Sequence, residues 1–126
     1  MSIPEDLKYT KEHEWVRVEG EEVVVGITEF AQSELGEIVF VELPEVGNTV
    51  EKGATLCVVE STKAASDVYA PVAGKISLIN EELANAPDLI NSEPFTGGWM
   101  VKLSEVSGDD MQALLDAKGY AAVLNE

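Results

Sequence analysis

The feature that most constrains this chain is a succession of short β-forming runs separated by turns. Between residues 9 and 104, valine, isoleucine, threonine and aromatic residues gather in short runs, and segments such as Glu19-Gly20-Glu21 and Pro44-Glu45-Val46-Gly47 interrupt them. β-Branched and aromatic residues favour strands, whereas glycine and proline mark turns. This spacing indicates a sandwich or a flattened barrel, so the fold class is predicted to be mainly β (α+β) with a few short helices.

Local patterns predict the individual strands. Residues 14–27 are expected to form a hairpin, because valine-rich halves flank the turn at Gly20. Residues 87–94 are predicted to form a loop. Further strands are expected at residues 38–43, 49–50, 54–59, 67–69, 75–80 and 99–103.

The short helices are predicted from capping residues. Thr28 can cap a helix over residues 29–35, and Gly36 stands at its stop position. Residues 81–84 indicate a single helical turn.

The chain is predicted to be one domain, because 126 residues can bury one core but not two well-packed ones. We expect this domain to span 1–126, with its core at about 9–104 and a C-terminal helix at about 108–124. Acidic residues at the start of that helix suit its dipole. Its apolar face comprises Met111, Leu114 and Leu115.

The charge of the chain excludes some partners. Asp and Glu number 24 against 8 Lys and Arg, which gives a formal net charge of -16 and predicts no binding to nucleic acid. Such a surface is suited to encounters with basic patches on other proteins. No apolar run approaches the roughly 20 residues of a membrane span. The start of the chain from Met1 to Asp6 lacks the layout of a signal or transit peptide, so the protein is expected to stay where it is made.

The residues that catalysis or metal binding requires are few. Cys57 is the only cysteine and lies in an apolar run, so it is expected to be buried and to form no disulfide. His13 is the only histidine, and its neighbours Glu12 and Glu14 would favour its protonated form; a structural role is expected for it. The chain has no cysteine or histidine pair at metal spacing and no phosphate-binding or nucleophile motif, which predicts no metal and no catalysis.

One lysine stands out by its position. The β-forming run at Val58-Val59 stops at Ser61-Thr62-Lys63-Ala64-Ala65-Ser66 and restarts at Asp67, which places Lys63 at an exposed hairpin tip. Taken alone, a lysine at a turn is an ordinary surface residue, so its neighbours must indicate whether it is modified.

Those neighbours resemble a known signature. Glu60, Lys63 and Ala64 stand in the pattern Glu-x-x-Lys-Ala, which is similar to the attachment signature of lipoyl-carrying β-domains. From about Leu7 to the C-terminal helix the chain resembles the glycine cleavage system H proteins, although Thr62 stands where that family often has valine. The segments that carry the resemblance are residues 9–16, 25–28, 36–47, 59–61, 70–74, 89–91 and 97–99.

The resemblance implies a fold and a site. The fold would be the biotinyl/lipoyl-type flattened β-barrel, or hybrid hammerhead, and Lys63 would carry lipoic acid in amide linkage, with Glu60 and Ala64 in the attachment motif. Glu14 and Asp67, with Glu12 as a further member, would lie near a cleft that receives the loaded arm, whose amine is cationic near neutral pH. The protein itself would be a non-catalytic carrier, and a monomer that presents its tip freely.

The resemblance also implies partners. A glycine decarboxylase with pyridoxal phosphate would load an aminomethyl group onto the arm, and an aminomethyltransferase would pass the carbon to tetrahydrofolate. A dihydrolipoamide dehydrogenase with FAD and NAD would then reoxidise the arm. A lipoate ligase or an octanoyltransferase would attach the lipoyl group in the first place.

Alternatives to this interpretation differ in what surrounds the lysine. A biotin carrier is disfavoured because its lysine is typically flanked by methionines, and a 2-oxo acid dehydrogenase lipoyl domain because the chain has no Ala/Pro linker. An H-like relay that passes octanoyl or lipoyl groups to other lipoate-dependent enzymes stays open. The start at Met1 suggests a bacterial cytoplasmic protein, although a mature mitochondrial chain would begin similarly.

Overall fold

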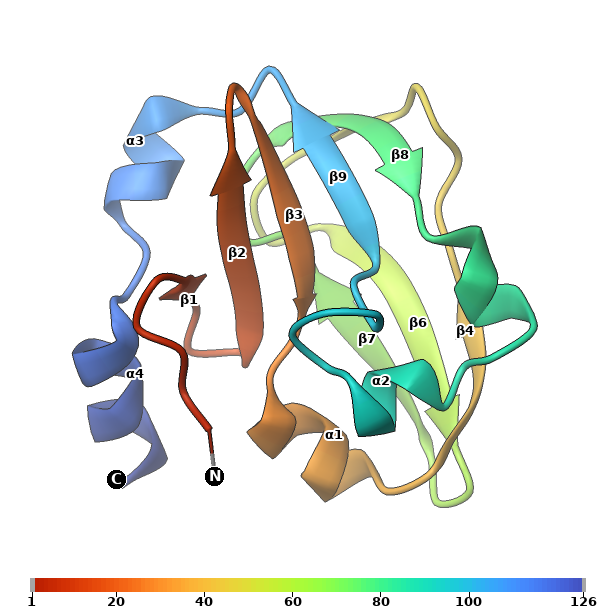
Figure 1. The fold of residues 1–126 in the computed structure, drawn as a ribbon. Helices are drawn as coiled ribbons and strands as arrows, with labels where there is room; N and C mark the ends of the chain where they lie inside the picture. The colour runs from red at the N-terminus through yellow and green to blue at the C-terminus, as the bar shows by residue number, and fades with distance from the viewer. Residues whose placement is uncertain (1, 126) are drawn as a thin grey trace.

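The computed structural model describes residues 2–125, so Met1 and Glu126 of the predicted domain lie outside the described residues. The fold is mainly β, with short helices at one end of the sheets and along one side (Figure 1). The elements are β1 (Lys8–Tyr9), β2 (Glu14–Glu19), β3 (Glu22–Ile27), α1 (Glu29–Leu35), β4 (Ile38–Glu42), β5 (Thr49–Val50), β6 (Thr55–Ser61), β7 (Ala65–Tyr69), β8 (Gly74–Ile79), the 3-10 turn η1 (Glu81–Ala84), α2 (Leu89–Ser92), β9 (Val101–Ser104), α3 (Gly108–Gln112) and α4 (Ala117–Leu124).

The strands form two antiparallel sheets around one main core. One sheet has the strand order β1-β2-β3-β9-β8-β5 and the other β4-β6-β7. Apolar residues from the inner faces of both sheets pack together in the core, among them Val25 of β3, Val59 of β6 and Leu103 of β9, each with no exposed surface. The predicted sandwich or flattened barrel is therefore what the chain forms.

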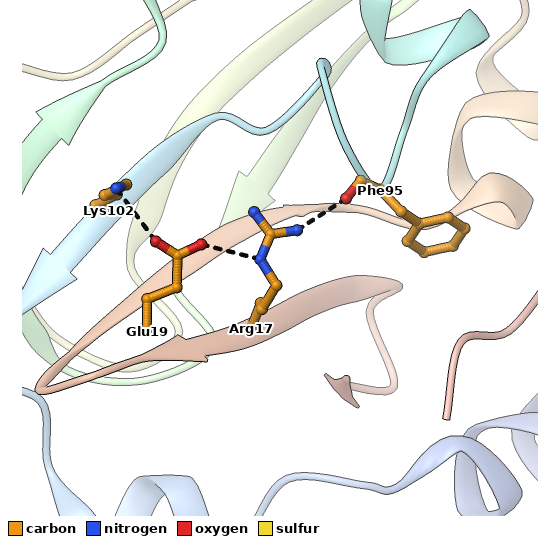
Figure 2. Close-up of polar contacts among 4 residues, drawn as sticks. All are labelled: Arg17, Glu19, Phe95 and Lys102. Atoms are coloured by element: carbon orange, nitrogen blue, oxygen red, sulfur yellow. Dashed lines mark hydrogen bonds and ion pairs between the residues drawn. The ribbon is translucent and has the colours of Figure 1, made fainter. Parts of the chain in front are cut away.

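The loop after α2 is held against the outside of the six-stranded sheet. Arg17 on β2 donates from its guanidinium to the carbonyl of Phe95 at 3.0 Å and pairs with Glu19 at 3.1 Å. Figure 2 shows this arrangement, with Lys102 of β9 on the other oxygen of Glu19 at 3.3 Å. These hydrogen bonds lower the pKa of Glu19. Exposed pairs of this kind contribute little stability, so their main effect is to orient the loop.

Helix α1 forms as its capping residues predict. The Thr28 hydroxyl oxygen accepts the N–H of Ala31 at 3.2 Å, and Gly36 ends the helix with a φ of 84°. Helix α2 lies inside the stretch predicted as a loop, and this prediction was wrong. Its Asn91 donates to the Gln32 side chain and to the Gly36 carbonyl, both at 2.8 Å, so α2 fastens the end of α1.

The predicted C-terminal helix is broken in two. Ser107 caps α3, and Asp116 caps α4 by accepting the N–H of Gly119 at 2.7 Å. Between them, Leu115 exchanges two backbone hydrogen bonds of 2.8 Å with Tyr9 of β1. This strand-like pairing replaces the helical bonds of the intervening residues, and Lys118 and Gly119 lie inside α4 instead of ending a helix.

Helix α4 packs on a second apolar cluster beside β1 and β2. Tyr120 is 1% exposed and stacks on Tyr9, with ring centroids 4.7 Å apart. Trp15 completes this cluster with Leu7 and Val24. Among the described residues, no helix is long and apolar enough to cross a membrane.

Candidate functional site

Lys63 lies exposed in the turn that joins β6 to β7, at the hairpin tip where the sequence places it. The turn is held by Ser61, whose hydroxyl oxygen accepts the N–H groups of Lys63 at 3.1 Å and Ala64 at 3.2 Å. The backbone N–H of Ser61 donates to the Ala64 carbonyl at 2.8 Å, and that of Thr62 to the Glu37 carbonyl at 3.1 Å. The lysine is thus free at its end and fixed at its base.

The stem of Lys63 lies against Gly36. A Cβ atom built on Gly36 would be 3.3 Å from Cε of Lys63, and the φ of 84° at this glycine is one that other residues rarely adopt. The residue that ends α1 therefore also leaves room for the lysine.

The other two residues of the attachment motif lie on the exposed side of the hairpin. Glu60 is paired in register with Ala65 of β7 and with Phe40 of β4. Phe40 is 50% exposed, so an aromatic side chain and a carboxylate stand side by side near the tip. Ala64 is exposed, and its carbonyl takes part in the turn bonds of Ser61.

A cleft of about 170 Å³ adjoins the hairpin. Apolar residues of β3, α1, β6 and β7 form part of its lining. Its polar lining comprises Glu12, His13, Glu14, Glu34, Ser66 and Asp67. The structure thus brings together the three carboxylates that the sequence indicates, and it adds Glu34 and His13.

The motif residues Glu60, Lys63 and Ala64 do not line the cleft. A larger hollow of about 240 Å³ lies between β1 and the segment after α3, lined in part by Lys11, Lys52 and Leu114. It shares no lining residue with the cleft, and its lining contains no carboxylate and no residue of the β6–β7 hairpin.

Glu14 is the buried carboxylate of the cleft, with 3% of its surface exposed. The Thr10 hydroxyl donates to its Oε1 atom at 2.6 Å. Burial raises the pKa of Glu14 from 4.5 to about 7, against the opposing hydrogen bonds from Thr10 and from the backbone of Tyr69. A cation in the cleft would favour the ionised form of this group.

His13 has a left-handed backbone, with a φ of 72°. Its ring lies 4.7 Å from that of Phe30, and its Nδ1 atom is 2.8 Å from the hydroxyl of Tyr120. Burial lowers the pKa of His13, although Glu12 and Glu34 act in the opposite direction. Glu12 therefore acts in the direction expected for a flanking carboxylate, but burial outweighs it and the net shift favours the neutral ring.

Cys57, the remaining reactive residue considered in the sequence, does not line the cleft. Cys57 is 2% exposed, and burial raises the pKa of its thiol to about 12. Within residues 2–125, no group of three or more histidine, cysteine or acidic residues is arranged to hold a metal ion.

Comparison with known proteins gives a consistent result. The profile of the family described as glycine cleavage H-protein matches residues 7–126. The glycine cleavage system H protein of Bacillus cereus (strain AH187) is 54% identical over 126 residues, which cover all of this chain and 99% of that protein. That of Anaeromyxobacter sp. (strain K) is 51% identical, over all of this chain and 98% of that protein.

A solved structure agrees with the sequence matches. The crystal structure of a glycine cleavage system H protein from Mycobacterium marinum superposes with a TM-score of 0.88 at 39% identity, and covers 98% of this chain and 100% of that one. The predicted family and fold class are thereby confirmed. The chain belongs to the glycine cleavage H-protein family, the carrier component of the glycine cleavage system.

Proposed function

We propose that this protein is the lipoyl-bearing shuttle of a glycine cleavage system, with the lipoyl group attached to Lys63. The observation that carries the proposal is the position of Lys63, an exposed amine on a turn whose backbone is fixed by Ser61, beside an acidic cleft. Family membership supports the carrier role, because H proteins are carriers of lipoate.

The residues around Lys63 fit such a group. A lysine tip that protrudes from paired strands can enter the active sites of several enzymes, and the tether keeps its cargo at high effective concentration. Conversion of the amine into an amide removes its charge and lowers the desolvation cost of entering a buried site. When bound, the lipoyl group would supply a dithiolane, one sulfur of which carries the cargo.

The cleft fits the cargo. Its lining combines apolar residues such as Val59 and Leu35 with the carboxylates of Glu12, Glu14 and Asp67. Apolar surface suits the hydrocarbon part of an arm, and carboxylates suit a cationic amine. Docking there would shield a water-sensitive aminomethyl group between visits to partner enzymes.

The partners follow from the steps that such an arm must pass through. A glycine decarboxylase with pyridoxal phosphate loads the carrier, an aminomethyltransferase with tetrahydrofolate unloads it, and a dihydrolipoamide dehydrogenase with FAD and NAD reoxidises it. A lipoate ligase or octanoyltransferase attaches the arm. The bacterial relatives support a bacterial cytoplasmic setting, and we propose a monomer.

The alternative of a relay for octanoyl or lipoyl groups would use the same lysine. Neither of these acyl groups is a cation, so a relay has no use for the carboxylates of Glu14 and Asp67 in the cleft. The cleft therefore favours the aminomethyl carrier.

The test is modification of the purified protein by a lipoate ligase with lipoic acid, read by intact mass and peptide mapping. We expect one lipoyl mass on Lys63 and none in Lys63→Arg. Lys52→Arg is the matched control, because Lys52 is also an exposed turn lysine and its replacement should leave the label in place. The proposal fails if a known lipoyl domain is labelled under these conditions and this chain is not.

A second measurement separates the carrier from the relay. The lipoylated protein is incubated with glycine and the decarboxylase, and its mass is followed. An aminomethyl adduct supports the carrier, whereas lipoylation without any glycine-dependent adduct supports the relay.

A further inference from the structure

A chain of hydrogen bonds joins the C-terminal helix to the wall of the cleft. The hydroxyl of Tyr120 on α4 lies 2.7 Å from Oγ1 of Thr28 and 2.8 Å from Nδ1 of His13. Tyr120 is held in place by burial and by its stacking on Tyr9. One hydroxyl thus connects the residue that caps α1 with the single histidine of the protein.

The positions of the protons in these hydrogen bonds follow from the number of available acceptors. Thr28 is 1% exposed, and its Oγ1 already accepts the N–H of Ala31. Among the described residues, the other polar partner of Oγ1 is the Tyr120 hydroxyl, so the Thr28 proton must be donated to the Tyr120 oxygen. The opposite direction would leave a buried hydroxyl proton without an acceptor, which is unfavourable.

The same reasoning determines the form of His13. If Thr28 donates to Tyr120, the Tyr120 proton is free to be donated to Nδ1 of His13. A ring nitrogen that accepts a hydrogen bond carries no proton. The imidazole is therefore neutral, with its proton on Nε2.

We propose that Tyr120 is a positioning residue of the cleft, which keeps His13 neutral by donating to Nδ1 and so leaves the cleft carboxylates unopposed toward a cationic guest. The presence of a cationic amine in the cleft rests on the proposed function, whereas the protonation state of His13 does not. An imidazolium at this position would repel an amine cation and neutralise one carboxylate.

The carboxylates around His13 would favour its protonated form if nothing opposed them. Glu12 and Glu14 flank it in the chain, Glu34 faces the cleft from α1 and Asp67 from β7. All four, where ionised, favour a protonated ring. Tyr120 from α4 and the burial of the ring oppose them, and the pKa of His13 is lowered.

The histidine cannot easily turn away from this hydrogen bond. Its backbone N–H donates to the Thr10 carbonyl at 3.2 Å, and its carbonyl accepts the N–H of Thr28 at 3.0 Å. Its ring lies between Phe30 and Tyr120, at centroid distances of 4.7 Å and 5.7 Å. The position of the ring is therefore a property of the folded protein.

The test is the ¹⁵N spectrum of the imidazole as a function of pH, which is unambiguous because the chain has one histidine. We expect the neutral Nε2–H form at pH 7 in the unmodified protein. In Tyr120→Phe, the loss of the donor should give a mixture of tautomers and raise the titration midpoint by about 0.5 to 1 pH unit. An Nδ1–H tautomer in the unmodified protein overturns the proposal even if the variant fails to fold.

Tyr9→Phe is the matched control. It removes the hydroxyl of the stacked partner, which donates to the Pro4 carbonyl at 2.5 Å and not to the cleft. Its imidazole spectrum should match that of the unmodified protein, and equal changes in both variants would show a general effect of hydroxyl loss and overturn the proposal.

A second measurement uses the lipoylated protein loaded with the aminomethyl group. As the pH falls through the raised midpoint, Tyr120→Phe should lose its cargo faster than Tyr9→Phe. If the spectra change as expected but the cargo is retained equally, the cleft does not receive the cation; that result contradicts the proposed docking and the purpose assigned to Tyr120, while the tautomer stands.

Discussion

Burial affects the pKa values of Glu14 and His13 in the cleft more than neighbouring charges do. Burial raises the pKa of Glu14 and lowers that of His13, so both shifts favour the neutral forms. A cleft lined by four carboxylates thus contains one that can be neutral before a cation arrives. Binding of an amine cation would then be coupled to the release of a proton from Glu14.

Replacement of Glu14 by Gln should make stability less dependent on pH. Because the folded-state pKa is raised to about 7, the folded protein binds more protons than the unfolded chain between about 4.5 and 7, and stability is lost as the pH rises through this window. Relative to the variant, the unmodified protein should lose up to about 3 kcal/mol of its free energy of unfolding over this window. Denaturant unfolding at pH 4.5, 6 and 8 measures the difference. A difference that does not change with pH would contradict the buried, shifted carboxylate.

The sequence predicted some single residues well and others not at all. The small residues around Lys63 were sufficient to place it at a tip, and the family resemblance pointed to Glu14 and Asp67. Glu34 and Tyr120 carried no such signal, because folding alone brings Glu34 of α1 to the cleft and Tyr120 of α4 to His13 in its wall. The sequence indicated the effect of the flanking carboxylates on His13 but not the larger opposing effect of burial, since adjacency in sequence does not reveal burial.

Among the elements, the β6–β7 hairpin depends on one side chain for the geometry of its tip. Ser61 accepts two backbone N–H groups and donates to the Ala64 carbonyl, so it replaces interactions that strand pairing no longer supplies in the turn. The Thr62 N–H bond to Glu37 ties the same turn to the segment that leaves α1. The presentation of Lys63 is therefore a property of the hairpin as a unit.

Ser61→Ala should loosen this tip. Loss of these hydrogen bonds at a half-buried position should reduce the free energy of unfolding by about 1 kcal/mol. The kcat/KM of lipoylation should fall as well, because the lysine would be less well positioned for the ligase. Thermal unfolding and the initial rate of labelling measure the two effects.

Ser104→Ala is the control for this prediction, since Ser104 on β9 makes a single 3.4 Å bond in the other sheet. It should leave the labelling rate unchanged. If Ser61→Ala were labelled as fast as the unmodified protein, the tip would not need to be rigid.

Helices were predictable where their signals were local. The ends of α1 followed from Thr28 and Gly36. Helix α2 was missed because it is one turn long and depends on the bonds of Asn91 to α1. The break before α4 was missed because Leu115 pairs with Tyr9, a residue from the other end of the chain. Tertiary contacts override helix periodicity at such places.

At the scale of the whole molecule, the net charge of -16 should act on encounters with partners. A field of one sign extends over a Debye length, about 10 Å at 0.1 M salt, and steers oppositely charged surfaces together. Exposed Val39 and Phe40 near the hairpin offer an apolar surface once an encounter has occurred. Charge would therefore affect the rate of association more than the strength of the final contact.

Raising the salt concentration should slow reoxidation of the lipoylated protein by dihydrolipoamide dehydrogenase. We expect kcat/KM to fall about tenfold between roughly 20 and 500 mM salt, as screening removes the attraction. Neutral free dihydrolipoamide is the control, because it lacks the charge of the carrier. Equal salt dependence for both substrates would show that the charge has no part in the encounter.

The burial of Cys57 gives the carrier a simple thiol chemistry. A thiol that is 2% exposed and whose pKa is raised to about 12 is almost entirely un-ionised at neutral pH and out of reach of a dithiolane. The arm then has no sulfur on the body of the protein with which to form a mixed disulfide. An alkylating reagent used under native conditions should therefore label this chain only on the arm, so the mass added to the carrier would report the free thiols of the arm and nothing else on the protein.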